Sequence, residues 1–354
     1  MWEEFKIKNF ILKNRIVRSA TNEHLGTLDG MITDEYIRTY EKLAKSGIGM
    51  IITSHMAVNK DQRADLTHIC INEKENYDRL CELTRKVHNN NSFIIAQLSY
   101  GGRPASKLIG KKAMTPSETD ETSFMSYNDL KKCVSDYVNA IKVAKSAGFD
   151  GIQLHLAHRY LLCEFLDPYY NKRDDEYGGN VVNRYRIVHE ILEGVKEIVS
   201  DSNFLVLAKL NSTSFGSEDF IMQQIDVCRM LKDDGVDCIE VSGCDYKNYK
   251  QTLPYYLQQA LEIKNSVNIP IMLVGGFRNC ENINFALEKG IDLVSMARPF
   301  INDDNFVSKL KNNESSKCIN CNRCFTIYNT LYKRCVFHKD VNLQLYDNYK
   351  DACK

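Results

Sequence analysis

The sequence predicts an α/β protein built as a (β/α)8 TIM barrel, and three observations lead to this fold. Eight apolar runs of strand length alternate with longer segments of helical periodicity. The runs are continuously apolar, which is typical of parallel strands covered on both faces. No strand is followed by a G-x-G-x-x-G turn or a G-x-x-x-x-G-K-[ST] loop, and eight units in about 300 residues favour a closed barrel over an open sheet.

The eight predicted strands follow one another at intervals that leave room for a helix after each. Many of their residues are β-branched, as strands favour. In a barrel of this kind the chemistry belongs at the C-terminal ends of the strands, so the residues that follow each run are the candidates for function. The runs cover residues 15–20, 50–54, 93–99, 151–155, 204–210, 238–242, 269–274 and 292–297.

Two of the intervening segments have an especially clear helical period. Residues 127–147 place apolar side chains three and four positions apart, with Ser126 and Asp129 as a capping box before them and Gly148 as the stop. Residues 181–199 repeat that spacing. We therefore predict one continuous helix in each segment.

The composition excludes several classes of protein. Lys+Arg 46 and Asp+Glu 46 give a formal net charge of zero, so the chain lacks the basic excess that binds nucleic acid or an anionic membrane. No apolar stretch approaches the ~20 residues that cross a bilayer, and the first residues do not form a signal peptide. With 13 cysteines and no export signal, we expect a cytoplasmic protein with reduced thiols.

Polar residues cluster after the fourth predicted strand, where His155, His158, Arg159 and Tyr160 fall within six positions. A single histidine at a strand end is often structural, but two histidines and a tyrosine together are harder to explain that way. Two imidazoles can donate hydrogen bonds to one substrate oxygen, and a nearby phenol can deliver a proton.

Other strand ends carry residues suited to an anionic cofactor. The glycine pair after the seventh strand and Arg298 after the eighth fit the usual phosphate site of these barrels. Lys209, at the end of the fifth strand, can stabilise negative charge on a cofactor ring. The alternative for Lys209 is a plain ion pair with a neighbouring carboxylate.

Several stretches resemble the old yellow enzyme family, the FMN-dependent NADH:flavin oxidoreductases. Each match is weak alone, but their order and their placement at strand ends make the combination specific. The resemblance covers residues 4 to 337 and rests on LKNRIVRSAT at 12–21, AQLSYGGR at 96–103, HLAHRYLLCEFLDPYYNKRDDEYGG at 155–179, VGGFRN at 274–279 and SMARPFI at 295–301.

The resemblance implies FMN, with NADH or NADPH as reductant, and an ene-reductase that passes hydride to the β-carbon of an activated alkene. His155 and His158 would bind the substrate's carbonyl oxygen, and Tyr160 would protonate the α-carbon. The residues implied for the flavin are Ser19, Ala20 and Thr21 through their backbone, Ala57 and Gln97 at the ring, Lys209 beside the N1/O2 locus, and Gly275, Gly276, Ala297 and Arg298 at the phosphate.

Two positions depart from the family's pattern. Asn22 stands where Thr or Cys is common, and Arg159 stands where Gly is usual. An arginine near an apolar flavin favours an anionic partner, so we expect Arg159 to bind a substrate carboxylate; the alternative is that it turns into solvent. An enoate, an enone, an enoyl thioester or a propionate-bearing tetrapyrrole would be the substrate.

The last part of the sequence is rich in cysteine. We expect two regions, the FMN-binding barrel in residues 1–315 and a Cys-rich segment in 316–354. C-x₂-C-x₂-C spacing with a fourth cysteine nearby suits a [4Fe–4S] cluster or zinc, with free thiols as the alternative. The motif resembles that of the 2,4-dienoyl-CoA reductase and trimethylamine dehydrogenase group, although two spacings are one residue short. The four residues are Cys318, Cys321, Cys324 and Cys335.

Two other functions stay open beside the ene-reductase. One is an amine dehydrogenase on the same fold, which Tyr160 and the paired histidines disfavour because an amine has no carbonyl to bind. The other is an electron-transfer module in which FMN and a cluster serve a protein partner. We expect no second flavin domain after residue 354, and a cluster would then need an external electron donor or would serve structure alone. A homo-oligomer is a further open point.

Overall fold

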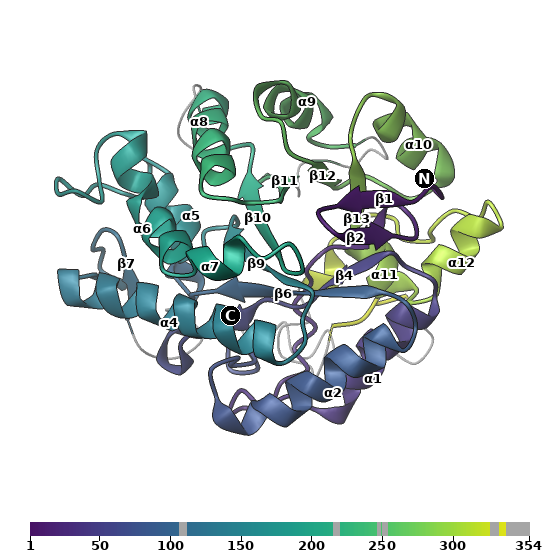
Figure 1. Cartoon of the computed structure of the whole chain (residues 1–354), viewed down its shortest axis with the longest axis horizontal. Helices are drawn as coiled ribbons and strands as arrows, with labels where there is room; N and C mark the ends of the chain where they lie inside the picture. Colours follow the sequence, from purple (N-terminus) through teal and green to yellow (C-terminus); the bar gives the residue numbers. More distant parts are fainter. Residues whose placement is uncertain (106–111, 215–219, 246–248, 250–253, 326–332, 338–354) are drawn as a thin grey trace.

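Eight parallel strands close into a barrel in the computed structural model, which describes residues 1–105, 112–214, 220–245, 249, 254–325 and 333–337 (Figure 1). Each strand is hydrogen-bonded to two neighbours, and the pairs β4–β6 and β13–β3 complete the ring. Every strand falls on a predicted run, so the (β/α)8 prediction is confirmed. The strands are β3 (Ile16–Arg18), β4 (Met50–Ile52), β6 (Phe93–Ser99), β9 (Gly151–Leu156), β10 (Leu205–Asn211), β11 (Cys238–Ser242), β12 (Ile271–Val274) and β13 (Leu293–Met296).

Helices surround the strands on the outside of the barrel (Figure 1). The longer ones are α1 (Asp34–Lys45), α2 (Tyr77–His88), α4 (Tyr127–Ser146), α6 (Val181–Glu193), α8 (Phe220–Asp233), α9 (Leu257–Ser266) and α10 (Cys280–Glu288). Shorter ones are α5 (Leu161–Leu166), α7 (Lys196–Val199), α11 (Arg298–Asn302) and α12 (Phe306–Lys311). No helix among the described residues has both the length and the apolar character needed to cross a bilayer.

Short strands outside the ring complete the fold. The hairpin of β1 (Phe5–Ile7) and β2 (Phe10–Leu12) is antiparallel, β5 (Met56–Ala57) pairs with β6, and β7 (Ala113–Thr115) pairs with β8 (Thr122–Phe124). Ile7 and Leu12 of the hairpin join the apolar residues of the barrel strands in one buried cluster. The hairpin therefore seals one end of the barrel and leaves the opposite end for a site.

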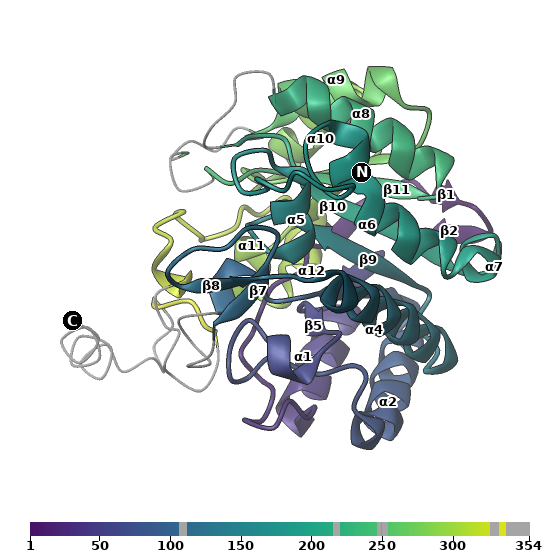
Figure 2. The same cartoon turned by 90° about the vertical axis from the view of Figure 1, so that its left-hand side faces the viewer.

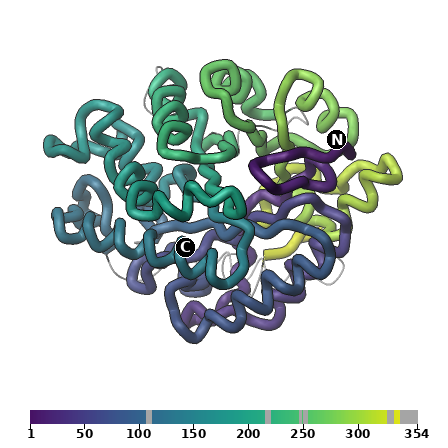
Figure 3. Tube along the Cα trace, in the orientation of Figure 1, coloured from purple at the N-terminus to yellow at the C-terminus, as the bar shows by residue number. Residues whose placement is uncertain are grey.

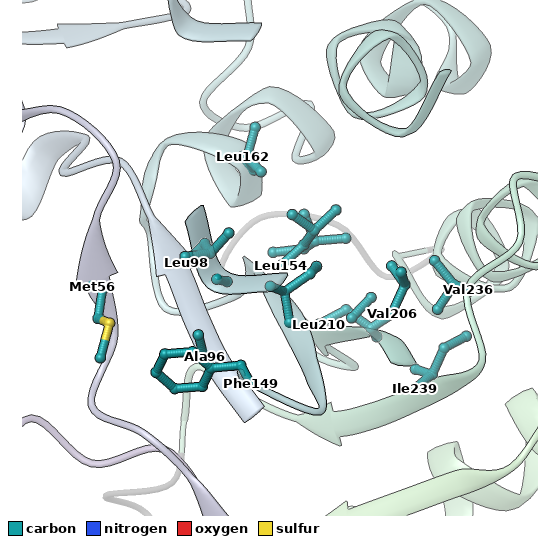
Figure 4. Packing of buried hydrophobic residues seen from close by; sticks show 14 of the residues in the cluster. Met56, Ala96, Leu98, Phe149, Leu154, Leu162, Val206, Leu210, Val236 and Ile239 are labelled. Atoms are coloured by element: carbon teal, nitrogen blue, oxygen red, sulfur yellow. The ribbon is translucent and has the colours of Figure 1, made fainter. Parts of the chain in front are cut away.

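A second and larger apolar cluster fills the layer between the barrel and its helices. Leu98 of β6 lies beside Leu154 of β9, and Val206 of β10 lies near Val236 and Ile239 (Figure 4). The strands are thus buried on both faces, which explains their continuous apolar sequence.

The helix predictions are confirmed at one place and wrong at another. Helix α4 begins after Ser126, whose hydroxyl accepts from the Asp129 N–H while the Asp129 carboxylate accepts from the Ser126 N–H. The continuous helix predicted over 181–199 is instead α6 and α7, because α6 ends at Gly194. A Cβ atom at Gly194 would lie 2.7 Å from a Val138 methyl of α4, so glycine permits the two helices to pack closely here. Glycine also weakens a helix, and α6 ends at this position.

The described residues of the Cys-rich segment, 316–325 and 333–337, contact the rest of the fold. The Ser316 N–H donates to the Arg278 carbonyl (2.7 Å), and this yellow segment lies beside α11 (Figure 2). The predicted division into 1–315 and 316–354 stays a prediction, and residues 326–332 and 338–354 of it lie outside the described residues. In Figure 3 the purple N-terminal part of the chain lies beside the green and yellow C-terminal parts, in agreement with the pairing of β3 with β13.

Candidate active site

A cavity of about 420 Å³ opens at the C-terminal ends of the barrel strands. This volume lies within the range of about 300–1,000 Å³ that is usual for small-molecule sites. Polar side chains from most of the strand ends reach it, as the barrel rule predicts. Twelve of the sequence-predicted site residues line it: Ser19, Ala20, Thr21, Gln97, His155, His158, Arg159, Tyr160, Lys209, Gly275, Ala297 and Arg298.

Two predicted residues, Ala57 and Gly276, do not line this cavity. Ala57 lies in β5, where its N–H donates to Ile69 (2.7 Å) and its carbonyl accepts from Ile71 (3.1 Å), so its backbone is fully engaged. His55, two positions earlier, lines the cavity in its place. The strand-end rule applied to β4 could have found His55, because it follows that strand by three residues.

His155, His158 and Tyr160 lie together at the end of β9. The His155 ring centroid is 4.5 Å from that of Tyr160 and 5.3 Å from that of His158. His158 Nε2 is 2.9 Å from Ser242 Oγ, whereas the buried His155 Nδ1 has no hydrogen-bond partner within the described residues. Burial lowers the pKa of both imidazoles, that of His158 to about 3. Both rings are therefore neutral at pH 7.

The backbone after β9 makes a turn that brings these side chains together. His158 and Arg159 both have left-handed backbone angles, with φ of 59° and 64°. Such angles are costly outside glycine, about 1 kcal/mol or more each. The turn packs on Gly102, where a Cβ atom would lie 2.8 Å from the Leu161 nitrogen. This turn places Arg159, an exposed residue, at the cavity.

Lys209 is held inside the barrel by a buried polar network. Its Nζ donates to Ser19 Oγ (2.8 Å) and lies 3.4 Å from Glu240 Oε1. Gln97 Nε2 donates to Gln153 Oε1 (2.7 Å), and Gln153 Nε2 donates to Glu240 Oε2 (2.9 Å). Burial lowers the pKa of Lys209, with the Glu240 carboxylate opposing that shift.

Glu240 and Gln153 hold Lys209 and Gln97 in place, and the sequence analysis did not identify them. The signal was available, since both are polar residues inside otherwise apolar strands. The ion pair of Lys209 with Glu240 is also the alternative that the sequence left open for this lysine. Because Lys209 also lines the cavity, the ion pair with Glu240 and a role beside a cofactor are compatible.

The cavity also offers donors for an anion. Within the described part of the chain, the backbone N–H groups of Ala297 and Arg298, which line the cavity, and of Gly276, which follows the lining residue Gly275, donate to no acceptor. The Arg298 guanidinium donates to Asn322 Oδ1 (2.8 Å) and to Tyr255 Oη (3.1 Å). Open amides beside an arginine are the donor set that phosphate prefers.

These residues fit flavin mononucleotide by the chemistry of their donors. His155, whose Nδ1 has no hydrogen-bond partner within the described residues, and Lys209 line the cavity together with Ala297 and Arg298. A cation suits a ring that becomes anionic on reduction. Gln97 also lines the cavity and supplies an amide.

Comparisons with known proteins identify the family of this chain. Residues 1–317 match the NADH:flavin oxidoreductase / NADH oxidase family. The chain belongs to the old yellow enzyme family. It is 28% identical to a 4,4'-dithiodibutanoate disulfide reductase from Rhodococcus erythropolis over 93% of each chain. It is 32% identical to an NADPH dehydrogenase from Bacillus subtilis, over 85% of this chain and 90% of that one.

A solved structure supports the fold of this family member. The complex of 2-naphthoyl-CoA reductase with 2-naphthoyl-CoA superimposes with a TM-score of 0.82 at 21% identity, over 91% of this chain. This chain spans only 54% of that longer protein. Family membership establishes an NAD(P)H:flavin oxidoreductase, and with it the flavin and the nicotinamide reductant expected from the sequence.

As a member of the old yellow enzyme family, the chain departs from the pattern at Asn22, which lines the cavity. Its Nδ2 donates to Asp65 Oδ2 (2.7 Å), and its Oδ1 accepts from the His24 N–H (3.2 Å). Both ends of the amide are thus engaged within the protein.

The four C-terminal cysteines line one small cavity beside Arg298. Within the described residues, no group of three or more His, Cys, Asp or Glu side chains is arranged to hold a metal ion. The thiols as placed do not fit a cluster, so the prediction of iron–sulfur or zinc is not confirmed. They are Cys318, Cys321, Cys324 and Cys335.

Proposed function

We propose that this protein is an FMN-dependent ene-reductase that uses NAD(P)H to reduce an activated C=C bond. The observation that carries the proposal is the convergence of His155, His158 and Tyr160 on one wall of the cavity that Lys209 also lines. Two neutral imidazoles and a phenol suit the activation of a conjugated carbonyl compound better than any other common substrate.

The residues divide the chemistry among them. His155 and His158 bind the carbonyl oxygen of the substrate through their N–H groups, which draws electron density from the alkene. When bound, FMN supplies hydride transfer from NAD(P)H to the β-carbon. Tyr160 holds its hydroxyl proton for the α-carbon, and Lys209 holds positive charge where the ring becomes anionic.

The two alternative functions, electron transfer and amine oxidation, do not require the paired histidines and Tyr160. Single-electron transfer to a protein partner needs neither a proton donor nor a pair of imidazoles. Amine oxidation offers no carbonyl oxygen for His155 and His158. The paired histidines and Tyr160 therefore favour reduction of an alkene.

The test is the Tyr160→Phe variant, followed separately in its two half-reactions. We expect flavin reduction by NAD(P)H to be nearly unchanged, because no proton from Tyr160 enters that step. Alkene reduction, measured with 2-cyclohexenone, should slow by about 10²–10⁴-fold. Tyr169→Phe, at an exposed position, is the matched control. Equal losses in both half-reactions would remove Tyr160 as the donor.

We further propose an anionic substrate, bound through its carboxylate by Arg159. The guanidinium is exposed and lines the cavity, on a turn that holds it there. Arg159→Gly should raise the KM for an enoate by about 10–100-fold, as expected for loss of a charged hydrogen bond. The neutral amide of the same skeleton should be affected little. Equal effects on the two substrates would contradict this assignment.

A further inference from the structure

A row of buried side chains leads away from the cavity behind Tyr160. Tyr160 Oη is 3.3 Å from His55 Nε2, and His55 Nδ1 is 2.8 Å from Ser99 Oγ. Ser99 Oγ is in turn 3.4 Å from His68 Nε2. The His55 ring lies between those of His68 and Tyr160, at centroid distances of 4.0 and 4.8 Å. His55, Ser99 and His68 are at most 4% exposed, so bulk water does not compete for these bonds.

The far end of the row sets the direction of every bond in it. The Ala64 backbone N–H donates to His68 Nδ1 (2.8 Å). A backbone amide can only donate, so Nδ1 of His68 is the acceptor and its proton resides on Nε2. Burial lowers the pKa of His68 to about 4, which keeps the ring neutral at pH 7.

The direction then passes along the row to Tyr160. Because His68 Nε2–H donates to Ser99 Oγ, the Ser99 hydroxyl proton is left for His55 Nδ1. His55, also neutral because burial lowers its pKa, must therefore carry its proton on Nε2. That N–H donates to Tyr160 Oη, so the tyrosine hydroxyl is the acceptor on this side.

We propose that His55, fixed in its Nε2–H tautomer by Ser99 and His68, is a positioning residue that directs the Tyr160 hydroxyl proton toward the substrate and stabilises the phenolate left behind. The inference rests on the proposed role of Tyr160. In the step concerned the Tyr160 O–H bond breaks and a C–H bond forms at the substrate α-carbon. The phenolate then accepts the His55 N–H bond until water in the cavity restores its proton.

The row orients and does not relay protons. Its last donor is the Ala64 amide, which cannot give up a proton under these conditions. A proton therefore cannot reach Tyr160 along it. What the row supplies is a fixed donor aimed at the atom where negative charge develops, the arrangement that stabilises charge most effectively in a buried site.

The direct test reads the tautomer in the unmodified protein with FMN bound. Nitrogen-15 spectra of histidine-labelled protein distinguish a protonated from an unprotonated ring nitrogen, and His55→Gln identifies the His55 signals. We expect the proton of His55 on Nε2. A proton on Nδ1, or on both nitrogens, would overturn the inference whatever the activity of the protein.

Kinetics of variants give a second test. His55→Leu should slow alkene reduction by about 10–100-fold while flavin reduction by NAD(P)H stays unchanged. His55→Gln should recover part of that loss, because its amide can donate toward Tyr160. Ser99→Ala should also slow alkene reduction, by a smaller factor, because His55 then loses the hydrogen bond that fixes its tautomer. His189→Gln, at an exposed site, should have no effect.

The outcomes separate this inference from the proposed function. If Tyr160→Phe slows alkene reduction but the His55 and Ser99 variants do not, the row has no positioning role and the ene-reductase proposal stands. If Tyr160→Phe leaves alkene reduction unchanged, the proposed function fails. The tautomer is still measurable in that case. Should His55→Leu fail to fold, Ser99→Ala and the nitrogen spectra decide the matter.

Discussion

Lys209 and Glu240 form an ion pair that is buried inside the barrel. Their side chains are 4% and 0% exposed, and the register places Lys209 of β10 directly beside Glu240 of β11. Ser19, Ser295 and Gln153 donate to the same carboxylate. A buried carboxylate with several donors tolerates the loss of a cation poorly, because burial leaves no water to replace it.

Lys209→Met should therefore destabilise the protein by about 3 kcal/mol, measured by urea unfolding without cofactor. Adding Glu240→Gln to that variant should restore part of the loss, because the unpaired charge disappears. Lys132→Met, which breaks an exposed ion pair with Asp136 on α4, should change the free energy of unfolding by less than about 0.5 kcal/mol. A double variant no more stable than Lys209→Met would show that the carboxylate is not the cause.

At the residue scale, the sequence predicted most of the residues that line the cavity, but not the buried residues behind them. The strand-end rule located His155, His158, Lys209 and Arg298, because those residues lie at the ends of apolar runs or within three residues after them. Ala57 was predicted from the family resemblance alone, whereas the residue that lines the cavity is His55. Ser99 Oγ, at the end of β6, links His55 to His68, which lie 44 and 31 residues before it in the chain, and no local sequence period indicates such a contact.

Among the elements, strands were predicted better than helices. Continuous apolar runs admit few other structures once they alternate with helices, so all eight barrel strands were identified. The break at Gly194 was missed because its cause is tertiary, the approach of Val138 from α4. The loop that places Tyr255 against Gly275 is also tertiary, and no sequence signal indicated it.

Helix α4 offers a test at this scale. Ser126→Ala removes the hydroxyl that accepts from the Asp129 N–H. We expect the free energy of unfolding to fall by about 1 kcal/mol, because a helix N-terminus loses an acceptor. Ser126→Thr keeps the acceptor and should cost only a few tenths of that. Equal losses for alanine and threonine would mean that the cap contributes nothing.

The whole molecule should respond to acid through its buried histidines. Burial lowers the pKa of His55, His68, His155 and His158, to about 4 for His68 and about 3 for His158. In the unfolded chain these groups titrate near 6.5. The unfolded state therefore binds more protons between about pH 6.5 and pH 4, and stability falls as the pH falls through that window.

The expected slope is about 1.4 kcal/mol per pH unit for each histidine that stays neutral in the folded protein. Urea unfolding at pH 7.5, 6, 5 and 4.5 measures it. Stability should be highest at the upper end of the series. A free energy of unfolding that is constant from pH 6.5 to 4.5 would contradict the neutral, buried state of these rings.

The pairing of β3 with β13 has a consequence for how the protein is made. Ser19 and Arg298 both line the cavity and follow neighbouring strands, which are synthesised almost 280 residues apart. While a ribosome is still translating the segment between them, the barrel has an open seam and the phosphate donors do not yet exist. Loading with cofactor therefore follows synthesis, and cellular supply of flavin acts on the finished chain.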